Sequence, residues 1–256
     1  MSTHLLLAAA IAAVTIGLLW RARLRERHIG HLQHRLEVAA EDLQRLQLSC
    51  ARFAPVSVID RVVTEGLETG AEWKEITALF ADIVGYTAIS ERMDAHPLAR
   101  MLNGYYQSMS DAIEQHRGHV STFLGDGILA YFGAFDPNPW QSDDAVRAAL
   151  AMREALAEYN RKLTAEGLQP LVIGIGLHRG WVLAGLVGSR QRKEYCCVGR
   201  TVNLAARVQS LTRSHNVDIL LTETVREKLD PTFTLRALPA TPVKGIEEPV
   251  VTYTVG

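Results

Sequence analysis

The stretch Glu75–Thr87, with the sequence EITALFADIVGYT, constrains the fold of this chain more than any other. Apolar and β-branched residues fill Ile76–Phe80, which is typical of a strand buried in a sheet, and Asp82 follows almost at once. Burying an unpaired carboxylate costs several kcal/mol, so Asp82 needs backbone donors, a cation or a metal ion. The simpler alternative is that Asp82 caps the helix that follows.

Two short turns carry the polar residues of this region. Gly85 and Thr87 lie in a turn whose backbone amides can face an anion at the start of a helix. A second carboxylate, Asp126, lies in a Gly-Asp-Gly turn between two apolar runs, which predicts a β-hairpin over residues 120–133. Asp is also simply a favourable turn residue there. A metal-binding carboxylate beside a phosphate-accepting turn is the combination that nucleotide chemistry uses.

Composition excludes some partners. The chain has 256 residues, with Lys+Arg 27 against Asp+Glu 28, so no overall charge indicates nucleic acid as a partner. Its three cysteines, Cys50, Cys196 and Cys197, have neither a metal-binding spacing nor a plausible disulfide framework. We therefore expect the globular part to lie in a reducing, cytoplasmic compartment.

The N-terminal residues predict a membrane anchor. Leu5–Trp20 is an uncharged apolar run of about 16 residues, short for a span but extendable toward the N-terminus. Positive charge follows it, at Arg21, Arg23, Arg25 and Arg27, and such charge marks the cytoplasmic side. Residues 1–20 are thus predicted to form an uncleaved single-pass anchor in the inner, cytoplasmic membrane, with the rest of the chain in the cytoplasm. A buried helix or a signal helix is the alternative.

The next segment shows a heptad pattern. Apolar or small residues alternate in steps of three and four, at Ile29, Leu32, Leu36, Ala39, Leu43, Leu46, Cys50 and Phe53. This pattern predicts a two-stranded coiled-coil helix over residues 21–54, the alternative being an amphipathic helix packed on its own domain. Pro55 ends the pattern, residues 55–71 are predicted to be a linker, and residues 72–256 a globular domain.

Periodicity and breaker residues give the remaining elements of that domain. Further strands and helices alternate along it, which indicates an α+β domain. Helices are predicted at 89–116, at 142–163 and from Thr201 onward, and strands at 171–177, 180–188, 195–199, 219–222 and 250–255. On the helix that begins at Thr201, Asn203 and Arg207 are four residues apart and therefore project from one face.

Three motifs together resemble one family. Asp82 after a buried strand, Gly125-Asp126-Gly127 in a hairpin, and Val202-Asn-Leu-Ala-Ala-Arg207 on a helix resemble the class III nucleotidyl cyclases, the adenylyl and guanylyl cyclase catalytic domain. The resemblance runs from about Trp73 to the C-terminus. It implies a ferredoxin-like α+β sandwich that works as a head-to-tail homodimer with composite active sites.

The resemblance also implies roles for single residues. Asp82 and Asp126, with the Ile83 carbonyl, would hold two Mg²⁺ or Mn²⁺ ions per active site. Gly85, Tyr86 and Thr87 would receive phosphate oxygens.

The remaining implied roles belong to the second half of the domain. Asn203 would position the ribose, and Arg207 would stabilise charge that develops on the α-phosphate. Lys244 would contact the terminal phosphates. In the family the metals come from one subunit, and the Asn, Arg and base contacts from the other.

The base-reading positions depart from the family pattern. Adenylyl cyclases usually carry Lys where this chain has Thr122, and Asp where it has Cys196, whereas guanylyl cyclases carry Glu and often Cys. Thr can donate or accept a hydrogen bond and a thiol bonds weakly, so this pair discriminates less sharply than charged partners would.

The predicted activity is that of a membrane-anchored homodimeric cyclase for intracellular signalling. It would convert a nucleoside triphosphate, ATP before others, to a 3′,5′-cyclic nucleotide and pyrophosphate. Guanylyl or pyrimidine nucleotide cyclase activity is the first alternative. A catalytically silent dimeric signalling module is the second, and the retention of both carboxylates argues against it.

Overall fold

The computed structural model describes residues 20–21, 34–43, 70–189, 191, 193–244, 246 and 248–256. The chain divides into two compact units, Met1–Asp60 and Arg61–Gly256. The described residues of the first unit are helical. Within the described ranges, no helix is both long and apolar enough to cross a membrane. Most of the predicted anchor, coiled coil and linker lies outside these ranges, so those three assignments stay predictions.

The second unit is built on a β-α-β-β-α-β core. Its elements are β1 (Glu72–Ile83), α4 (Ala95–Gln115), β2 (His119–Leu124), β3 (Gly127–Phe132), α5 (Gln141–Ala165) and β4 (Ile173–Gly188). The strands are antiparallel in the order β2-β3-β1-β4, which is the arrangement of a ferredoxin-like sandwich. The predicted α+β sheet fold is therefore confirmed, including the hairpin around Asp126.

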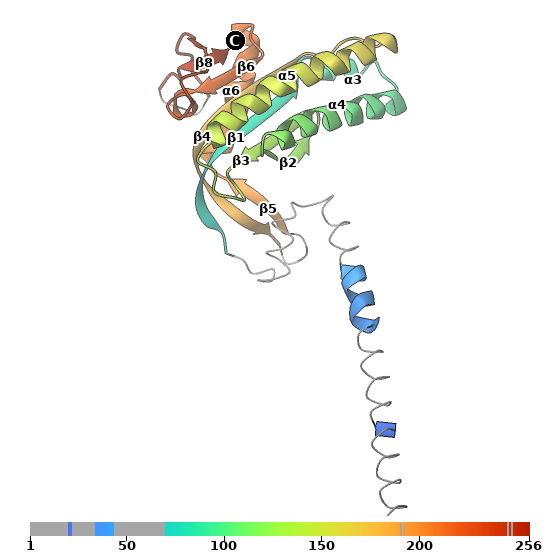
Figure 1. Cartoon of the computed structure of the whole chain (residues 1–256). Coiled ribbons are helices and arrows are strands. Elements are labelled where there is room, and N and C mark those ends of the chain that lie inside the picture. The colour runs from blue at the N-terminus through green and yellow to red at the C-terminus, as the bar shows by residue number, and fades with distance from the viewer. Residues whose placement is uncertain are drawn as a thin grey trace, which may run out of the picture. The chain divides into compact units, whose positions relative to one another are not determined.

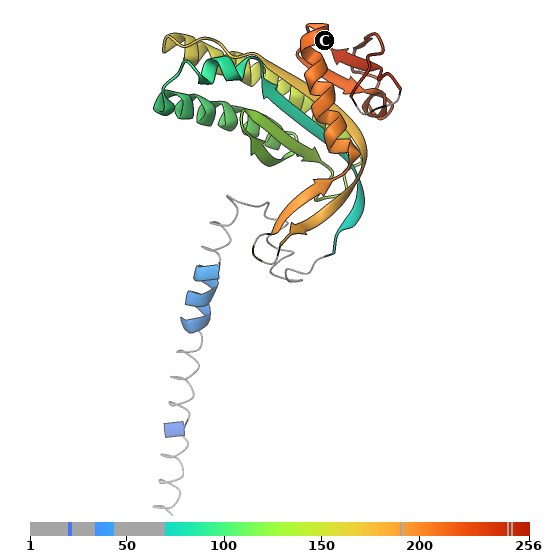
Figure 2. The same cartoon turned by 180° about the vertical axis from the view of Figure 1, so that it is seen from behind.

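The rest of the unit extends this sheet and covers its second face. The additional elements are α3 (Tyr86–Ser90), β5 (Lys193–Val198), α6 (Arg200–His215), β6 (Ile219–Thr222), α7 (Glu223–Arg226), β7 (Leu235–Ala237) and β8 (Thr252–Val255). The sheet continues from β4 through β6 and β8 to β7, and β5 pairs with β4. Helices α4 and α5 lie on one face of the sheet (Figure 1), and α6 lies on the other (Figure 2).

Strand β1 is buried on both of its faces. Successive side chains of a strand point to opposite faces. Leu79 and Ala81 accordingly belong to the core under α4 and α5, whereas Ile76 and Ala78 belong to the second core, which includes Val182 of β4. This double burial explains why Ile76–Phe80 is apolar almost without interruption, as the sequence predicts for a central strand.

Two predicted elements differ from the structure. The strands predicted at 171–177 and 180–188 are one strand, β4, because β1 pairs with it without a break from Ile173 to Ala184. The helix predicted at 89–116 is split into α3 and α4. Pro97 explains the split, since in a continuous helix it would lack the hydrogen bond to the carbonyl of Met93 and its ring would clash there.

Helix α6 packs unusually close to β4 because glycines line the contact. A Cβ atom on Gly176 would lie 2.2 Å from the backbone nitrogen of Gln209, and one on Gly174 would lie 2.2 Å from Thr212 Oγ1. Any larger residue at Gly176 must push the helix backbone away. The position of α6 on the sheet therefore depends on this small-residue contact.

We predict that Gly176→Ala lowers the free energy of unfolding by about 3 kcal/mol, because the added methyl overlaps the α6 backbone. Chemical denaturation of the full chain measures this. Gly70→Ala is the matched control, since a Cβ at Gly70 meets nothing within 4 Å. Equal effects of the two substitutions would contradict the packing argument.

Candidate active site

Two carboxylates meet at the end of β1. Because Ala81 pairs with Ile128 in the β1–β3 register, the turn between β2 and β3 lies beside the last residues of β1. The Ile83 N–H donates a hydrogen bond of 3.1 Å to Asp126 Oδ2. Asp82 lies in the same place, with its side chain 27% exposed. The structure thus brings together Asp82, Ile83 and Asp126, the three residues expected to hold metal ions.

The carboxylate pair has little positive charge near it. Burial, then the hydrogen bond and the repulsion between the two carboxyl groups, raise the pKa of Asp82 to about 7. Arg213 and the Ile83 N–H act in the opposite direction but more weakly. The Arg213 Nη2 atom lies 3.6 Å from Asp82 Oδ2, so this ion pair is loose. The pair can therefore accept further positive charge.

Helix α4 holds the hairpin turn that carries Asp126. The Tyr106 hydroxyl donates a hydrogen bond to the Gly125 carbonyl, and its ring lies 4.3 Å from that of Phe123, centroid to centroid. Gly125 has a φ of 64°, a left-handed conformation that favours glycine. These contacts hold Asp126 at the end of β1.

Gly85, Tyr86 and Thr87 follow the carboxylate strand directly. Gly85 is left-handed, with a φ of 74°, and precedes α3, which has only five residues. The Val84 N–H donates to the Val172 carbonyl at 2.8 Å, which ties the start of this turn to the chain just before β4. The N–H groups of a first helical turn have no partner inside the helix, so those of this turn can face a ligand.

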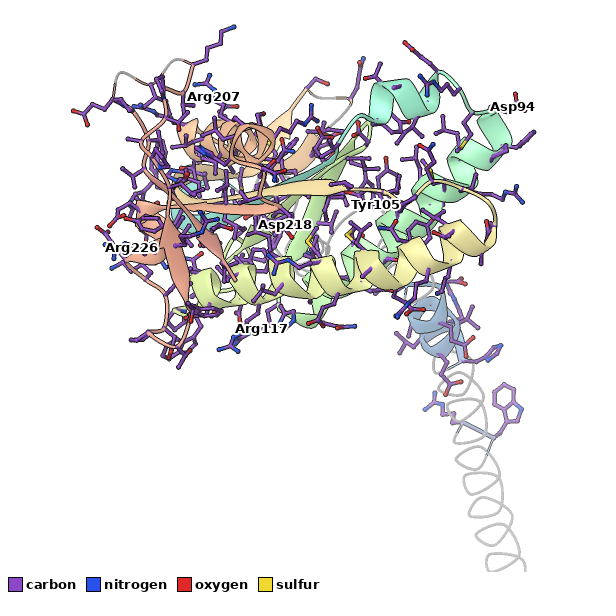
Figure 3. The ribbon with its side chains drawn as sticks, turned by 90° about the horizontal axis from the view of Figure 1, so that it is seen from above. Asp94, Tyr105, Arg117, Arg207, Asp218 and Arg226 are labelled. Carbon is purple, nitrogen blue, oxygen red and sulfur yellow. The ribbon has the colours of Figure 1, made fainter. Side chains whose placement is uncertain are left out.

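Asn203, Arg207 and Lys244 form a second group. Asn203 and Arg207 lie one turn apart on α6, the first exposed and the second half-buried. The Arg207 guanidinium donates to the backbone carbonyl of Lys244, an exposed residue in the loop between β7 and β8 (Figure 3 labels Arg207). The structure therefore brings Arg207 and Lys244 together.

The carboxylate pair and Asn203 lie at different ends of α6. Arg213, at the C-terminal end, contacts Asp82, whereas Asn203 precedes it by ten residues, roughly 15 Å along the helix axis. The contacts of β4 agree, because Gly174 faces Thr212 while Gly180 faces Thr201. One chain therefore does not bring Asn203 to its own carboxylate pair.

The two base-reading positions lie on different strands, β2 and β5, which are separated in the sheet by β3, β1 and β4. Thr122 is exposed on β2, and Cys196 is half-buried on β5. Tyr131 of β3 connects their neighbours, since its hydroxyl donates to the Cys197 carbonyl at 3.5 Å and is hydrogen-bonded to the Ser121 side chain. Burial, then the charge of the cysteine side chains, raises the pKa of the Tyr131 hydroxyl.

No local sequence signal marks the supporting residues Arg213 and Tyr106. Arg213 lies in an ordinary basic last turn of a helix, and Tyr106 lies on an amphipathic helix of which every turn has apolar residues. Their relation to the carboxylates depends on how α6 and α4 pack. Within the described ranges, no group of three or more His, Cys, Asp or Glu side chains is placed to hold a metal ion, so the candidate site is a two-carboxylate site.

Comparisons with known proteins agree with this arrangement. Residues 69–256 match the family described as the adenylate and guanylate cyclase catalytic domain. An adenylate cyclase of Anabaena cylindrica is 33% identical over 238 residues, covering 89% of this chain and 46% of that protein. The chain thus spans less than half the length of that relative.

Solved structures give the same result. The crystal structure of the guanylyl cyclase Cya2 has 35% sequence identity and a TM-score of 0.66, covering 73% of this chain and 94% of that one. The adenylyl cyclase CyaB from P. aeruginosa has 29% identity and a TM-score of 0.68, covering 73% and 96%. The chain therefore belongs to the adenylate and guanylate cyclase catalytic domain family.

Proposed function

We propose that this chain is a nucleotide cyclase, which converts a nucleoside triphosphate to a 3′,5′-cyclic nucleotide and pyrophosphate. The observation that carries the proposal is the Asp82–Asp126 pair at the end of β1, in a chain that belongs to the cyclase family and keeps Asn203 and Arg207. A module without activity would have no need to keep two repelling carboxylates in contact, because their repulsion lowers stability.

The donor set fits divalent cations. Oxygen ligands suit Mg²⁺ and Mn²⁺, and the raised pKa of Asp82 indicates a pair of carboxyl groups short of positive charge. Asp82, Asp126 and the Ile83 carbonyl would hold two such ions. When bound, the ions would neutralise phosphate charge and activate the ribose 3′-hydroxyl. The turn Gly85–Thr87 would orient the phosphates by its free N–H groups.

The second group, Asn203, Arg207 and Lys244, would contact the ribose and the phosphates of the nucleotide. Attack of the 3′-hydroxyl on the α-phosphorus develops negative charge on the phosphate oxygens. The Arg207 guanidinium has five N–H donors, so it can donate to the Lys244 carbonyl and still stabilise that charge. Asn203 would position the ribose, and the Lys244 ammonium would contact the terminal phosphates.

A homodimer with shared sites would bring the two groups together. Asn203 lies too far from the carboxylates of its own chain, so a second copy would supply them. An apolar surface supports this arrangement. Trp73 and Trp181 are 65% and 62% exposed. Trp73 and Val198 both pair with Leu183, and Trp181 lies two residues before Leu183 on the same strand. Trp73, Trp181 and Val198 therefore share one face of the sheet.

The strand segment that carries this surface is bonded to the start of α6, although α6 itself covers the opposite face of the sheet. The Thr201 hydroxyl donates to the Trp181 carbonyl at 2.8 Å, and Asn203 follows two residues later.

The base that the enzyme prefers depends on Thr122 and Cys196. The relatives include both an adenylate cyclase and a guanylyl cyclase, so similarity favours purines without choosing between them. We propose ATP as the preferred substrate and GTP as the second. Pyrimidine nucleotides are the third candidates, because the Thr122 and Cys196 side chains are small and neutral. The predicted N-terminal anchor and coiled coil would hold the paired catalytic domains at the cytoplasmic face of the membrane.

We predict that the full chain, incubated with each of the four nucleoside triphosphates and Mn²⁺, forms a cyclic purine nucleotide detectable by mass spectrometry. Asp126→Asn should reduce the rate at least about a hundredfold, because it removes a charged metal ligand. Absence of any cyclic product from the wild-type protein would refute the proposed activity.

A second prediction concerns stability without metal. The pKa of Asp82 is near its ordinary value of 3.8 in the unfolded chain and near 7 in the folded one. The folded state thus binds more protons between these values, and the free energy of unfolding falls as the pH rises through this window. In EDTA at about pH 8, Asp82→Asn should raise the free energy of unfolding by about 1–2 kcal/mol. A destabilised Asp82→Asn protein would contradict this account.

A third prediction tests the shared site. Asp82→Ala and Arg207→Ala proteins should each be inactive, and a mixture of them should recover activity, because one of the two sites in a mixed dimer keeps both groups intact. Activity assays before and after mixing measure this. If mixed dimers form, as a pull-down with two tags can show, but stay inactive, each site lies within one chain.

A further inference from the structure

Arg213 is the basic side chain that lies at the carboxylate pair. Its Nη2 atom is 3.6 Å from Asp82 Oδ2, and among the residues that the structure describes no second basic side chain pairs with Asp82 or Asp126. A guanidinium does not lose its proton in proteins. A positive charge is therefore present at the end of α6 whether or not the site holds a metal ion.

Helix α6, and not strand β4, supplies this charge. Gly174 pairs with Asp82 across β1 and β4, and residues directly opposite each other point to the same face. A Cβ on Gly174 would lie 2.2 Å from Thr212 Oγ1 and 2.9 Å from Gln209 Nε2. A basic side chain on β4 at this position would therefore displace α6. Thr212 is buried against the strand, and the next residue, Arg213, is exposed.

The contact between Arg213 and Asp82 can be exchanged for another. Its 3.6 Å is longer than the distance of about 2.7–2.9 Å that is typical of a charge-assisted hydrogen bond. The Arg213 side chain is 52% exposed, so water reaches the guanidinium. Exposed ion pairs of this kind contribute little to stability. Arg213 can thus leave Asp82 for a different anion without loss of the helix.

The proposed substrate would bring such an anion to the same end of β1. The turn Gly85–Thr87, which is proposed to orient the phosphates, begins three residues after Asp82. Divalent ions on the carboxylates would repel the guanidinium, whereas phosphate oxygens attract it. The planar fork of an arginine side chain also matches the geometry of a phosphate group.

We propose that Arg213 neutralises Asp82 while the site is empty and turns to the phosphates of the substrate when the carboxylates bind divalent ions. This inference rests on the proposed metal-binding role of Asp82 and Asp126. It makes Arg213 a phosphate-binding residue of the chain that holds the metal ions, whereas Arg207 and Lys244 would act from the other chain of the dimer.

The test compares Arg213→Gln with Arg161→Gln in the full chain. Both changes remove a guanidinium from an exposed ion pair on a helix, but Arg161 pairs with Glu158 on α5. Mn²⁺ alone is titrated into each protein and its binding is followed by electron paramagnetic resonance. The KM for the nucleotide that the wild type cyclises is measured at saturating Mn²⁺, and thermal unfolding in EDTA verifies that each variant is folded.

The Arg213 variant should change the two affinities in opposite directions. Arg213→Gln should bind Mn²⁺ about threefold to tenfold more tightly, because a competing positive charge is gone. Its KM for the nucleotide should rise about tenfold, because a charge-assisted hydrogen bond to phosphate is lost. Arg161→Gln should change neither value.

A conservative variant separates the charge from the shape of the side chain. Arg213→Lys keeps the positive charge, so its Mn²⁺ binding should equal that of the wild type. Its KM should lie between those of the wild type and Arg213→Gln, because an ammonium cannot form the paired hydrogen bonds of a guanidinium.

Failure of this inference is distinguishable from failure of the proposed function. Unchanged or weaker Mn²⁺ binding by Arg213→Gln, or an unchanged KM, would overturn the role of Arg213. The metal assignment would still stand if Asp126→Asn lost Mn²⁺ binding in the same experiment. A wild-type protein that binds no Mn²⁺ would overturn the metal assignment and this inference with it.

Discussion

The pairing of β1 with both β3 and β4 is the constraint on which the candidate site depends. Asp82 reaches the end of the sheet only because β1 is held along its length by β4, and Asp126 lies beside it only because the β3 register places the hairpin turn there. A slip of one residue would turn Asp82 to the opposite face and break the Ile83–Asp126 contact. The apolar residues on both faces of β1 make such a slip costly, because they would exchange one core for the other.

Strand β1 also carries the destabilising part of the site. The carboxylate pair repels itself, and the loose contact with Arg213 offsets only part of that repulsion. The fold tolerates this because Ile76, Leu79 and their neighbours bury β1 completely a few residues earlier. The middle of β1 thus stabilises the fold, whereas the carboxylate pair at its end destabilises it. Functional sites commonly violate the rules of stable folding in this way.

Local sequence patterns predict much of this arrangement. The turn Gly125-Asp126-Gly127 is enough to predict the hairpin, because a short glycine-containing loop between apolar runs permits little else. The continuity of β4 cannot be predicted in the same way, since Gly180 resembles a break until Thr201 is known to pack against it. Arg213 and Tyr106 have no sequence signal for their positions, because Arg213 reaches Asp82, and Tyr106 reaches the turn of Asp126, only through the packing of a whole helix. The roles of Asn203 and Arg207 stay predictions, although the structure places both on the same side of α6.

In the proposed dimer, each helix α6 would contribute residues to both composite sites. Its C-terminal end contacts Asp82 through Arg213, whereas Asn203 lies near its start and Arg207 at its middle, and these two would serve the partner's carboxylates. A shift of this helix along β4 would therefore alter both sites of a dimer at once. The glycine contacts at Gly174 and Gly176 leave the helix in direct contact with the strand, and at Gly176 that contact is with the helix backbone itself. A contact of this kind resists small displacements, so the two sites of a dimer would be held in one fixed relation by the packing of α6 on β4.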